Sequence, residues 1–345
     1  MIRIYIPSLV QKRYEYRRGD AQIIHDADKN AVVIDGGESD LYNQILNYCE
    51  AQGITHVTVI LTHWHYDHDI GLKQLLEGKL IIDAIYCPPP DETKTLTADE
   101  GVANYNRAMQ RIKLAKSLNK TIIYPPAAKT TSIKVGDIRC EIWRRKANKS
   151  DFGDYQINNT SLQAYFPDLQ YLTGGDIISA FDGYLKALKK PVTVFKIPHH
   201  GNACTNIPCS LLKELGAKLC WYNDSEPIGV GVGDTGFSEY GAGHCKKYFV
   251  TLPTHAAIYI TAADGKMTIK QGQKSWQYNI PYVGSKWIHD ANGWKYLLPD
   301  GKYAIGWQHL SWSKGKNWFY FDKHGYMLTG WQNLSWSGGK GWFFF

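Results

Sequence analysis

The chain has 345 residues, of which 44% are hydrophobic and 21% charged, and its formal net charge is +7. This length exceeds a single small module and allows one large domain with a buried core plus an appendage. No run approaches the roughly 18 consecutive apolar residues of a membrane-spanning helix, so we expect no membrane span. The opening residues also lack the segments of a signal peptide, which favours folding in the cytoplasm.

Seven cysteines are scattered along the chain without the spacing of metal ligands, and their number is odd. We therefore interpret them as buried or free thiols of a protein that folds in a reducing compartment. They are Cys49, Cys87, Cys140, Cys204, Cys209, Cys220 and Cys245.

Apolar, strand-like runs alternate with helical segments up to about residue 270. The runs occupy 31–37, 56–62, 80–86, 193–198 and 256–261. The clearest helix is expected from Asp99 to Asn119, with apolar positions at Val102, Met109, Ile112 and Leu114. Strands interleaved with helices predict a layered α/β domain, in which loops after strand ends carry the chemistry.

The segment Thr62–His68, with the sequence THWHYDH, carries the strongest functional pattern. It directly follows the apolar run VTVIL and places His63, His65, Asp67 and His68 in an H-x-H-x-D-H arrangement. Imidazole and carboxylate groups gathered on one loop form a ligand set that suits zinc or manganese. A polar surface loop is the alternative, but the strand-then-loop context favours a metal site.

Three other predicted strands also end in residues that bind metals. Asp35 ends VVIDGG, Asp176 ends YLTGGD, and His199 and His200 end KIPHHG. A carboxylate can bridge two metal ions about 3.5 to 4 Å apart, so Asp176 is the natural shared ligand. Asp35 is either an ordinary turn residue or a hydrogen-bonding support that orients the histidine loop.

Composition changes near residues 270–280. Nine of the twelve tryptophans follow Gln271, and eight lysines against three aspartates place five of the seven net positive charges there. The near-neutral first part weakens a nucleic-acid interpretation, so nucleic acid is the less favoured partner. We therefore predict a hydrolase domain over 1–270 and an aromatic module over 271–345.

The C-terminal module contains an internal repeat. Residues 306–329 are followed by a second copy at 330–345, so that Trp307 and Trp331 recur with a period of 24, and a degenerate copy precedes them at 292–307. Each unit combines an aromatic strand, a turn and a second short strand, which predicts a β-hairpin. A single hairpin cannot bury its aromatic face, so we expect the hairpins to stack.

Five motifs in order resemble the metallo-β-lactamase superfamily, and within it the branch that contains the C-terminal domain of DNA-internalisation competence proteins and the teichoic-acid phosphorylcholine esterases. They are VVIDGG, THWHYDHDIG, NNTSL at 158–162, YLTGGD and KIPHHG. The resemblance covers roughly residues 1–270. It implies an α/β fold with an αββα sandwich and two divalent metal ions, most readily zinc and alternatively manganese.

The resemblance also implies how the ligands divide between the metals. One metal would take His63, His65 and Asp176. The other would take Asp67, His68, Asp176 and one of His199 or His200. The candidate catalytic residues are Asp67, His200 and Asn159.

One departure concerns the first metal. Many superfamily members supply it with a third histidine from the middle of the domain, but no histidine lies between His68 and His199. Asn158 and Asn159 occupy about that place. Asn159 therefore either contacts a metal-bound water or a phosphate oxygen, or simply forms a turn.

Several residues near these motifs are weaker candidates. Trp64, Tyr66 and Lys196 flank the ligand loops and are candidates for the wall of a substrate pocket. The glycine-rich segment 229–236 lacks the strand-to-helix context of a nucleotide-binding loop and is predicted to be a flexible loop. His244 and His255 are expected to be core or surface histidines.

The repeats resemble choline-binding, or cell-wall-binding, repeats, whose pattern of glycines and aromatics is matched at 306–331. A quaternary ammonium has no hydrogen to donate, so aromatic faces hold it by cation–π attraction of about 0.5 to 2 kcal/mol per contact. A hairpin core is the alternative use of these rings. Because only two repeats are good copies, a dimer through the tail is one way to raise affinity. The predicted cage residues are Trp307, Trp318, Tyr320, Met327, Trp331 and Trp342.

Joined together, these features predict a metal-dependent phosphodiesterase that uses a metal-activated water on choline-decorated teichoic acid of the cell wall. The alternatives are a nuclease of the competence-protein kind tethered to the wall, and a non-catalytic wall-binding protein with a degenerate metal site. Action at the cell surface conflicts with the cytoplasmic features above. Release by lysis or phage, or a leader outside this sequence, would reconcile them.

Overall fold

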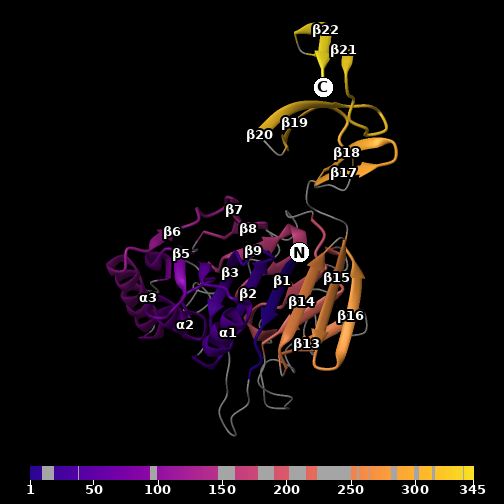
Figure 1. Cartoon of the computed structure of the whole chain (residues 1–345). Helices are drawn as coiled ribbons and strands as arrows, with labels where there is room; N and C mark the ends of the chain where they lie inside the picture. Colours follow the sequence, from indigo (N-terminus) through magenta and orange to yellow (C-terminus); the bar gives the residue numbers. More distant parts are fainter. Residues whose placement is uncertain are drawn as a thin grey trace. The chain divides into compact units, whose positions relative to one another are not determined.

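The computed structural model of the chain is shown in Figure 1. It describes residues 1–9, 19–37, 39–93, 99–146, 160–177, 190–201, 215–223, 250–254, 256–263, 265–280, 286–298, 303–312, 315–336 and 338–345. The chain divides into two compact units, Met1–Ile280 and Pro281–Phe345.

The described part of the first unit contains two β-sheets. The larger has nine strands in the order β16-β15-β14-β1-β2-β3-β4-β5-β6. Neighbours from β16 to β3 are antiparallel, and those from β3 to β6 are parallel. The strands are β1 Ile2–Ile6, β2 Ala21–Asp26, β3 Ala31–Gly36, β4 His56–Ile60, β5 Ile81–Tyr86, β6 Thr121–Ile123, β14 Ile258–Ala263, β15 Lys266–Gln271 and β16 Lys274–Asn279.

The second sheet has seven strands in the order β13-β12-β11-β10-β9-β8-β7 among the described residues. Its neighbouring strands from β10 to β13 are parallel, and those from β7 to β10 are antiparallel. The strands are β7 Thr131–Val135, β8 Ile138–Trp143, β9 Gln163–Phe166, β10 Tyr171–Thr173, β11 Val194–Lys196, β12 Leu219–Tyr222 and β13 Val250–Pro253.

A hydrophobic core fills the space between the two sheets. Side chains alternate between the faces of a strand, so Ile4 and Ile6 of β1 point into this core while Tyr5 points to the other face. From the second sheet, Phe166 and Trp221 enter the same core. Each fully buried side chain of this kind contributes about 1.5 to 3 kcal/mol, so the core between the sheets stabilises the first unit substantially.

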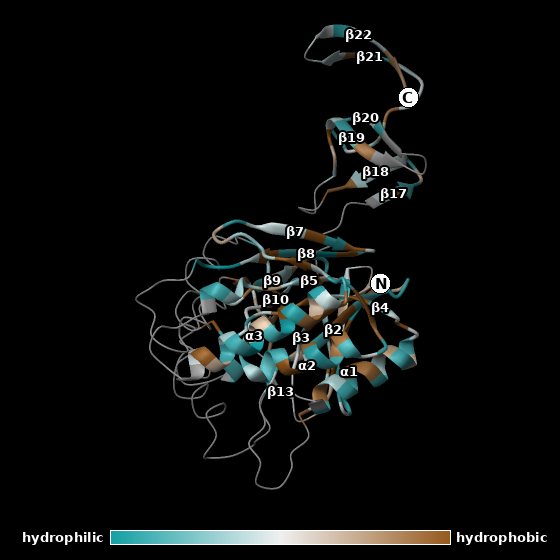
Figure 2. Cartoon of the chain, turned by 90° about the vertical axis from the view of Figure 1, so that its left-hand side faces the viewer, coloured by the Kyte–Doolittle hydropathy of each residue, from teal (hydrophilic) through white to brown (hydrophobic). Residues whose placement is uncertain are grey.

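Three helices cover the other face of the nine-stranded sheet (Figure 2). They are α1 Ser39–Gln52, α2 Tyr66–Glu77 and α3 Asp99–Ser117. Short 3-10 helices lie at η1 Pro90–Thr93, η2 Pro167–Leu169 and η3 His199–Gly201. None of the described helices is both long and apolar enough to cross a membrane.

The outer face of the seven-stranded sheet also carries a buried cluster, which includes Tyr165, Phe195 and Tyr222. The segments 178–189 and 202–214, which follow β10 and β11, lie outside the described residues. The predicted α/β class with helices packed on a sheet is confirmed, whereas the second helical layer of the predicted αββα sandwich stays a prediction.

Helix α3 confirms the predicted helix, but its buried face differs from the apolar positions in the sequence. Val102 and Met109 are 49% and 42% exposed, although Ile112 is buried. The buried side is completed by the small residues Ala108 and Ala115. Small side chains allow a helix to approach the sheet closely, and a search for large apolar residues overlooks them.

The first unit extends past the predicted boundary at residue 270. Strand β16 pairs along its whole length with β15, and Trp276 and Tyr278 pack against the core between the sheets. Both aromatic residues lie after Gln271, where tryptophan becomes frequent in the sequence. Aromatic content changes before the first unit ends at Ile280, because an aromatic edge strand of the first sheet resembles the strands that follow.

The described part of the second unit forms three β-hairpins, the kind of element that the repeat pattern predicts. Their strands are β17 Lys286–Asp290 and β18 Gly293–Leu297, β19 Gly306–Trp312 and β20 Gly315–Phe321, and β21 Trp331–Trp336 and β22 Gly339–Phe344. Aromatic rings meet across neighbouring hairpins: the ring centroids of Trp287 and Phe319 lie 4.8 Å apart, and those of Trp307 and Phe343 lie 4.7 Å apart. The hairpins therefore stack through aromatic clusters.

A glycine pair sets the position of helix α2 on the sheet. A Cβ placed on Gly71 would lie 2.7 Å from the Cα of Gly36 in β3, and the Gly71 amide donates to the Gly37 carbonyl at 2.9 Å. The obstacle is backbone, which cannot rotate away as a side chain can. The start of α2 is thus held directly against the end of β3.

We predict that Gly71→Ala lowers the free energy of unfolding by about 3 kcal/mol, because the added methyl group overlaps backbone that cannot move without disturbing β3. Lys73→Ala on the same helix, where the side chain is 51% exposed, is the control and should change it by less than about 0.5 kcal/mol. Urea denaturation of both variants measures the difference. Equal stabilities would contradict the close contact.

Candidate metal centre

The histidine loop leaves the end of β4 and enters helix α2. The Leu61 amide donates to the Tyr86 carbonyl of β5, and the Thr62 carbonyl accepts from the Leu162 amide beside β9. Both hydrogen bonds are 2.8 Å long. The loop is therefore tied to both sheets. It presents His63 and His65 before α2, and Asp67 and His68 follow in the first turn of that helix.

Asp35 anchors this loop from the end of β3. Its carboxylate accepts hydrogen bonds from the Thr62 backbone at 2.6 Å and the Thr62 hydroxyl at 2.8 Å, and it lies 2.9 Å from His68 Nδ1. Asp35 itself has a φ of 55°, a backbone conformation that is uncommon outside glycine. The contact with Nδ1 orients the His68 ring so that Nε2 faces Asp176.

Three histidines converge on one oxygen of Asp176. Its Oδ2 lies 3.2 Å from the Nε2 atoms of His68 and His200, and 3.7 Å from that of His63. These side chains come from the loop after β4, the loop after β10 and the segment after β11. All are at least nine-tenths buried. The structure thus brings together residues that lie more than a hundred positions apart.

Three groups of described residues have donor atoms that lie within 4.8 Å of one another; besides Asp20, Asp35 and His68, two groups that share Asp176 could each hold a metal ion. One group is Asp67, His68, Asp176 and His200. The other is His63, His65 and Asp176. Asp176 belongs to both, as a bridging ligand would. These are the two sets that the resemblance implies.

Unsatisfied donor atoms show that this set fits divalent ions. The Nε2 atoms of His68 and His200 and the Oδ1 atom of Asp176 are buried and make no hydrogen bond within the described part of the chain. Buried polar atoms nearly always have a partner, and imidazole nitrogen with carboxylate oxygen is the ligand chemistry of zinc. The residues present therefore fit a pair of divalent ions.

The structure separates the two neighbouring histidines after β11. His200 Nε2 lies 3.0 Å from Asp67 Oδ2, within the second group, whereas His199 belongs to neither group. Both residues have a positive φ, 51° for His199 and 54° for His200. This geometry favours His200 over His199 as the ligand, an alternative that the sequence left open.

Buried charges control protonation throughout the centre. Burial alone would raise the pKa of Asp176, but His200, His68 and His63 lower it well below its usual range. Burial alone would lower the pKa of His200, but Asp176 and Asp67 raise it to about 9. Burial holds the pKa of His63 well below its usual value, with the nearby His68 acting in the same direction.

Asp20 is a part of the site that sequence reasoning missed. It lies just before β2, forms a buried ion pair with Lys196, and accepts a hydrogen bond from Asn223. Its carboxylate is 3.6 Å from His200 Nδ1 and 3.9 Å from His68 Nδ1. No motif surrounds Asp20, so only the fold reveals its place behind the two ligand histidines.

Two of the suggested pocket residues have structural roles instead. Lys196 is fully buried, and its ammonium group pairs with Asp20 and donates to the Gly175 carbonyl at 3.0 Å. Trp64 is also buried, and its indole donates to the Pro88 carbonyl at 2.8 Å. Neither residue can line an accessible pocket. Tyr66, in contrast, is 49% exposed beside the ligand loop.

Several predicted residues lie outside the described residues. They are Asn158, Asn159, His244, His255 and the glycine-rich segment 229–236. The role suggested for Asn159 stays a prediction.

Part of the chain is similar to known proteins. Residues 21–126, which include β2 to β6 and the histidine loop, match the family model of the metallo-beta-lactamase superfamily. This match covers less than half of the chain. The hydroxyacylglutathione hydrolase of Wigglesworthia glossinidia brevipalpis is 36% identical over 53 residues, which are 15% of this chain. The match spans 20% of that relative's length.

Solved structures of metallo-β-lactamases each match 50% of this chain. A metallo-beta-lactamase from Pontibacter korlensis has 16% identity and a TM-score of 0.32, with 67% of its chain covered. The DIM-1 metallo-beta-lactamase exposed to ceftazidime has 15% identity and a TM-score of 0.30, with 65% covered. The BLEG-1 B3 metallo-beta-lactamase has 15% identity and a TM-score of 0.32, with 71% covered.

We predict that the metal affinity of the candidate centre rises with pH between 6.5 and 9. Without metal, His200 keeps its proton up to a pKa of about 9, and a ligand histidine must lose that proton. Each released proton makes the apparent affinity rise by about tenfold per pH unit below that pKa. Titration with chelator-buffered zinc at several pH values measures this, and a flat affinity from pH 7 to 9 would contradict it.

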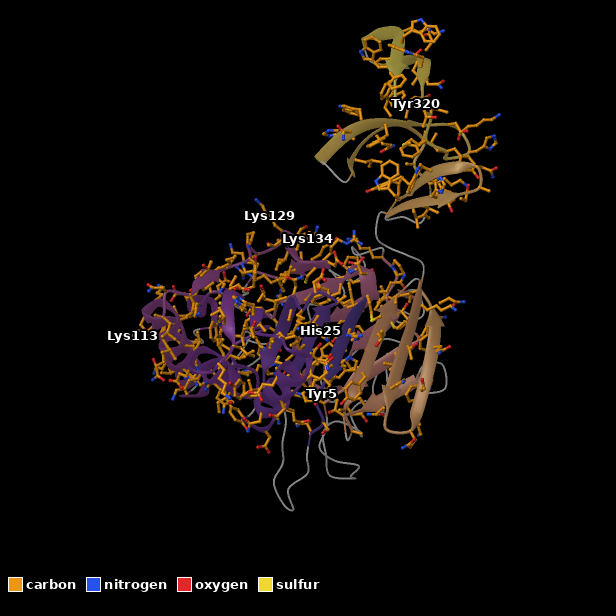
Figure 3. All side chains as sticks on the ribbon, viewed as in Figure 1. Tyr5, His25, Lys113, Lys129, Lys134 and Tyr320 are labelled. Atoms are coloured by element: carbon orange, nitrogen blue, oxygen red, sulfur yellow. The ribbon has the colours of Figure 1, made fainter. Side chains whose placement is uncertain are left out.

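The second unit has a separate candidate site, an aromatic pocket between two hairpins. It has a volume of about 440 Å³ and is lined by Trp307, Trp318, Trp336 and Phe343. Tyr320, labelled in Figure 3, meets Trp307 edge to face with ring centroids 5.4 Å apart. The lining is mostly apolar, so the pocket offers ring faces rather than hydrogen-bonding groups.

Two of the six cage residues predicted from the repeat, Trp307 and Trp318, line the pocket. The other two lining residues were not predicted. Trp331 and Trp342 are 68% and 65% exposed and do not line it, whereas Trp336 and Phe343 do. Residues 331 and 342 lie on one face of their hairpin, while 336 and 343 lie on the other. Matching residues by the 24-residue period therefore selects the face of the last hairpin that does not line this pocket. Tyr320 and Met327 are half-buried and do not line this pocket.

Proposed function

We propose that this protein is a metal-dependent hydrolase and that its substrate is the phosphodiester of choline-decorated teichoic acid at the bacterial cell wall. The observation that carries the hydrolase proposal is the convergence of three buried histidines on one Asp176 oxygen, within a metallo-β-lactamase superfamily domain. Two groups of ligands that share a carboxylate suit a two-metal reaction.

Two divalent ions held in this centre would supply Lewis-acid stabilisation of a phosphoryl oxygen and an activated water. The chain itself supplies position and a proton acceptor. Asp67 is the most accessible of the site carboxylates, with a side chain 13% exposed, so it is the group that can meet a water and accept its proton. His200 Nε2 lies 3.0 Å from Asp67 Oδ2 and 3.2 Å from Asp176 Oδ2, so His200 belongs to the same ligand group.

The aromatic pocket supports the choline part of the proposal. A trimethylammonium group cannot donate a hydrogen bond, so a cavity walled by indole and phenyl faces is the chemistry that recognises it. The pocket lined by Trp307, Trp318, Trp336 and Phe343 has these walls. A module that binds choline would keep the hydrolase on choline-bearing wall polymer, which is why we place its action at the cell surface.

We predict that the metal-loaded protein hydrolyses p-nitrophenylphosphorylcholine in preference to bis-(p-nitrophenyl)phosphate. His68→Ala and Asp176→Ala should each lower kcat/KM by at least about 1000-fold, because each removes a donor of the metal centre. His56→Ala is the matched control, since His56 is exposed and paired only with Asp83 among the described residues. It should retain full activity with unchanged metal content.

The other outcomes identify the alternative functions. Cleavage of only the generic diester, together with metal-dependent cleavage of DNA, would indicate a nuclease. Absence of bound metal and of any hydrolysis would indicate a binding protein. Metal-dependent release of phosphorylcholine from isolated choline-bearing wall is the decisive test of the natural substrate.

We also predict that Trp307→Ala weakens choline binding by the full chain at least tenfold, because it removes a wall of the pocket. Trp331→Ala changes the same residue type at an exposed position outside the pocket and should change binding by less than about twofold. Titration calorimetry with choline chloride compares the two. Equal losses in both variants would locate the site elsewhere.

A further inference from the structure

A lysine of the first hairpin already lies between aromatic rings. The Nζ atom of Lys295 in β18 is 4.0 Å from the centre of the Tyr326 ring and 4.7 Å from that of Tyr303. Asp290 Oδ2 lies 3.5 Å from the same nitrogen. An ammonium group within about 6 Å of a ring centre is attracted to the ring face, so these contacts form a cation site.

The walls of this site are fixed by other contacts. The Tyr326 hydroxyl donates to Asp290 Oδ2 at 3.2 Å and accepts from the Asn292 side chain at 3.2 Å. The Met327 amide donates to the Trp294 carbonyl at 2.7 Å, which ties the Tyr326 segment to β18. The Tyr326 ring is therefore held by contacts that do not involve Lys295.

The site remains accessible at the surface. Tyr303 is 40% exposed, and so is the side chain of Asp290, whereas the side chain of Lys295 between them is only 15% exposed. Two ring faces and a carboxylate suit any compact organic cation. The aromatic pocket at Trp307 has comparable walls, and its lining residues carry no cationic group.

We propose that Lys295 occupies, as an internal ligand, a cation site that would otherwise accept a quaternary ammonium headgroup. The tail would then hold one site filled by its own chain and one that is open to choline. This inference rests on the proposed recognition of choline by the tail. It explains why the degenerate repeat places a lysine between its own Tyr303 and Tyr326 of the next repeat: this cage stabilises the module instead of binding the wall.

The test is the number of choline sites on the full chain. Lys295→Ala removes the resident ammonium group and vacates the space beside the two tyrosines, so titration with choline chloride should show one more site than the wild type. Lys295→Met, which keeps most of the stem but loses the charge, gives a second variant if the alanine variant fails to fold. Lys295→Arg keeps a cation in place and should show the wild-type number.

Lys340→Ala is the matched control, because it removes the same charge from an exposed position of the last hairpin. It should leave the number of sites unchanged. An unchanged number in folded Lys295→Ala, or an equal gain in Lys340→Ala, overturns the inference while leaving choline binding by the wild type intact. A wild type without any choline site, beside a Lys295→Ala variant with one, refutes the proposed open pocket but supports the role of Lys295.

Discussion

The buried carboxylate of Asp176 is the group on which the metal centre depends. A charged carboxylate inside a protein is costly unless cations or hydrogen bonds compensate it. Here the compensation comes from three histidines and from Lys196, whose Nζ lies 3.6 Å from Asp176 Oδ1. The nearest atoms to Oδ2 are thus imidazole nitrogens, while Oδ1 faces the ammonium group. The fold therefore distinguishes the two oxygens of one carboxylate.

Supporting residues extend this arrangement outward. Asp35 fixes the His68 ring from one side, and the buried pair of Asp20 and Lys196 lies behind His200. Gly175 allows the loop of Asp176 to approach, because a Cβ there would lie 2.8 Å from Thr62 and its φ is 55°. Residues that bind no metal therefore decide where the donor atoms point, which is the usual division of labour around a metal.

Much of this centre could be predicted from sequence, because its residues follow apolar strands at regular places. The histidine loop, Asp35, Asp176 and the histidine pair all stand at strand ends. Asp20 has no such context, and its contacts depend on how β2 and β11 meet in space.

In the tail, the alternation of side chains along each strand would have placed Trp336 and Phe343 on the same face of the last hairpin. Which face a neighbouring hairpin covers is decided by packing, so periodicity alone chose other residues.

The hydrogen bond from Leu162 to the Thr62 carbonyl joins the two sheets at the ligand loop. His63 follows a strand of one sheet and His200 follows a strand of the other. A cation bound by ligands from both sheets would link the two sheets. It would close a loop of more than a hundred residues, as a long-range disulfide does. Metal occupancy would then report that the two sheets have docked, so catalytic competence and completed folding would be a single event.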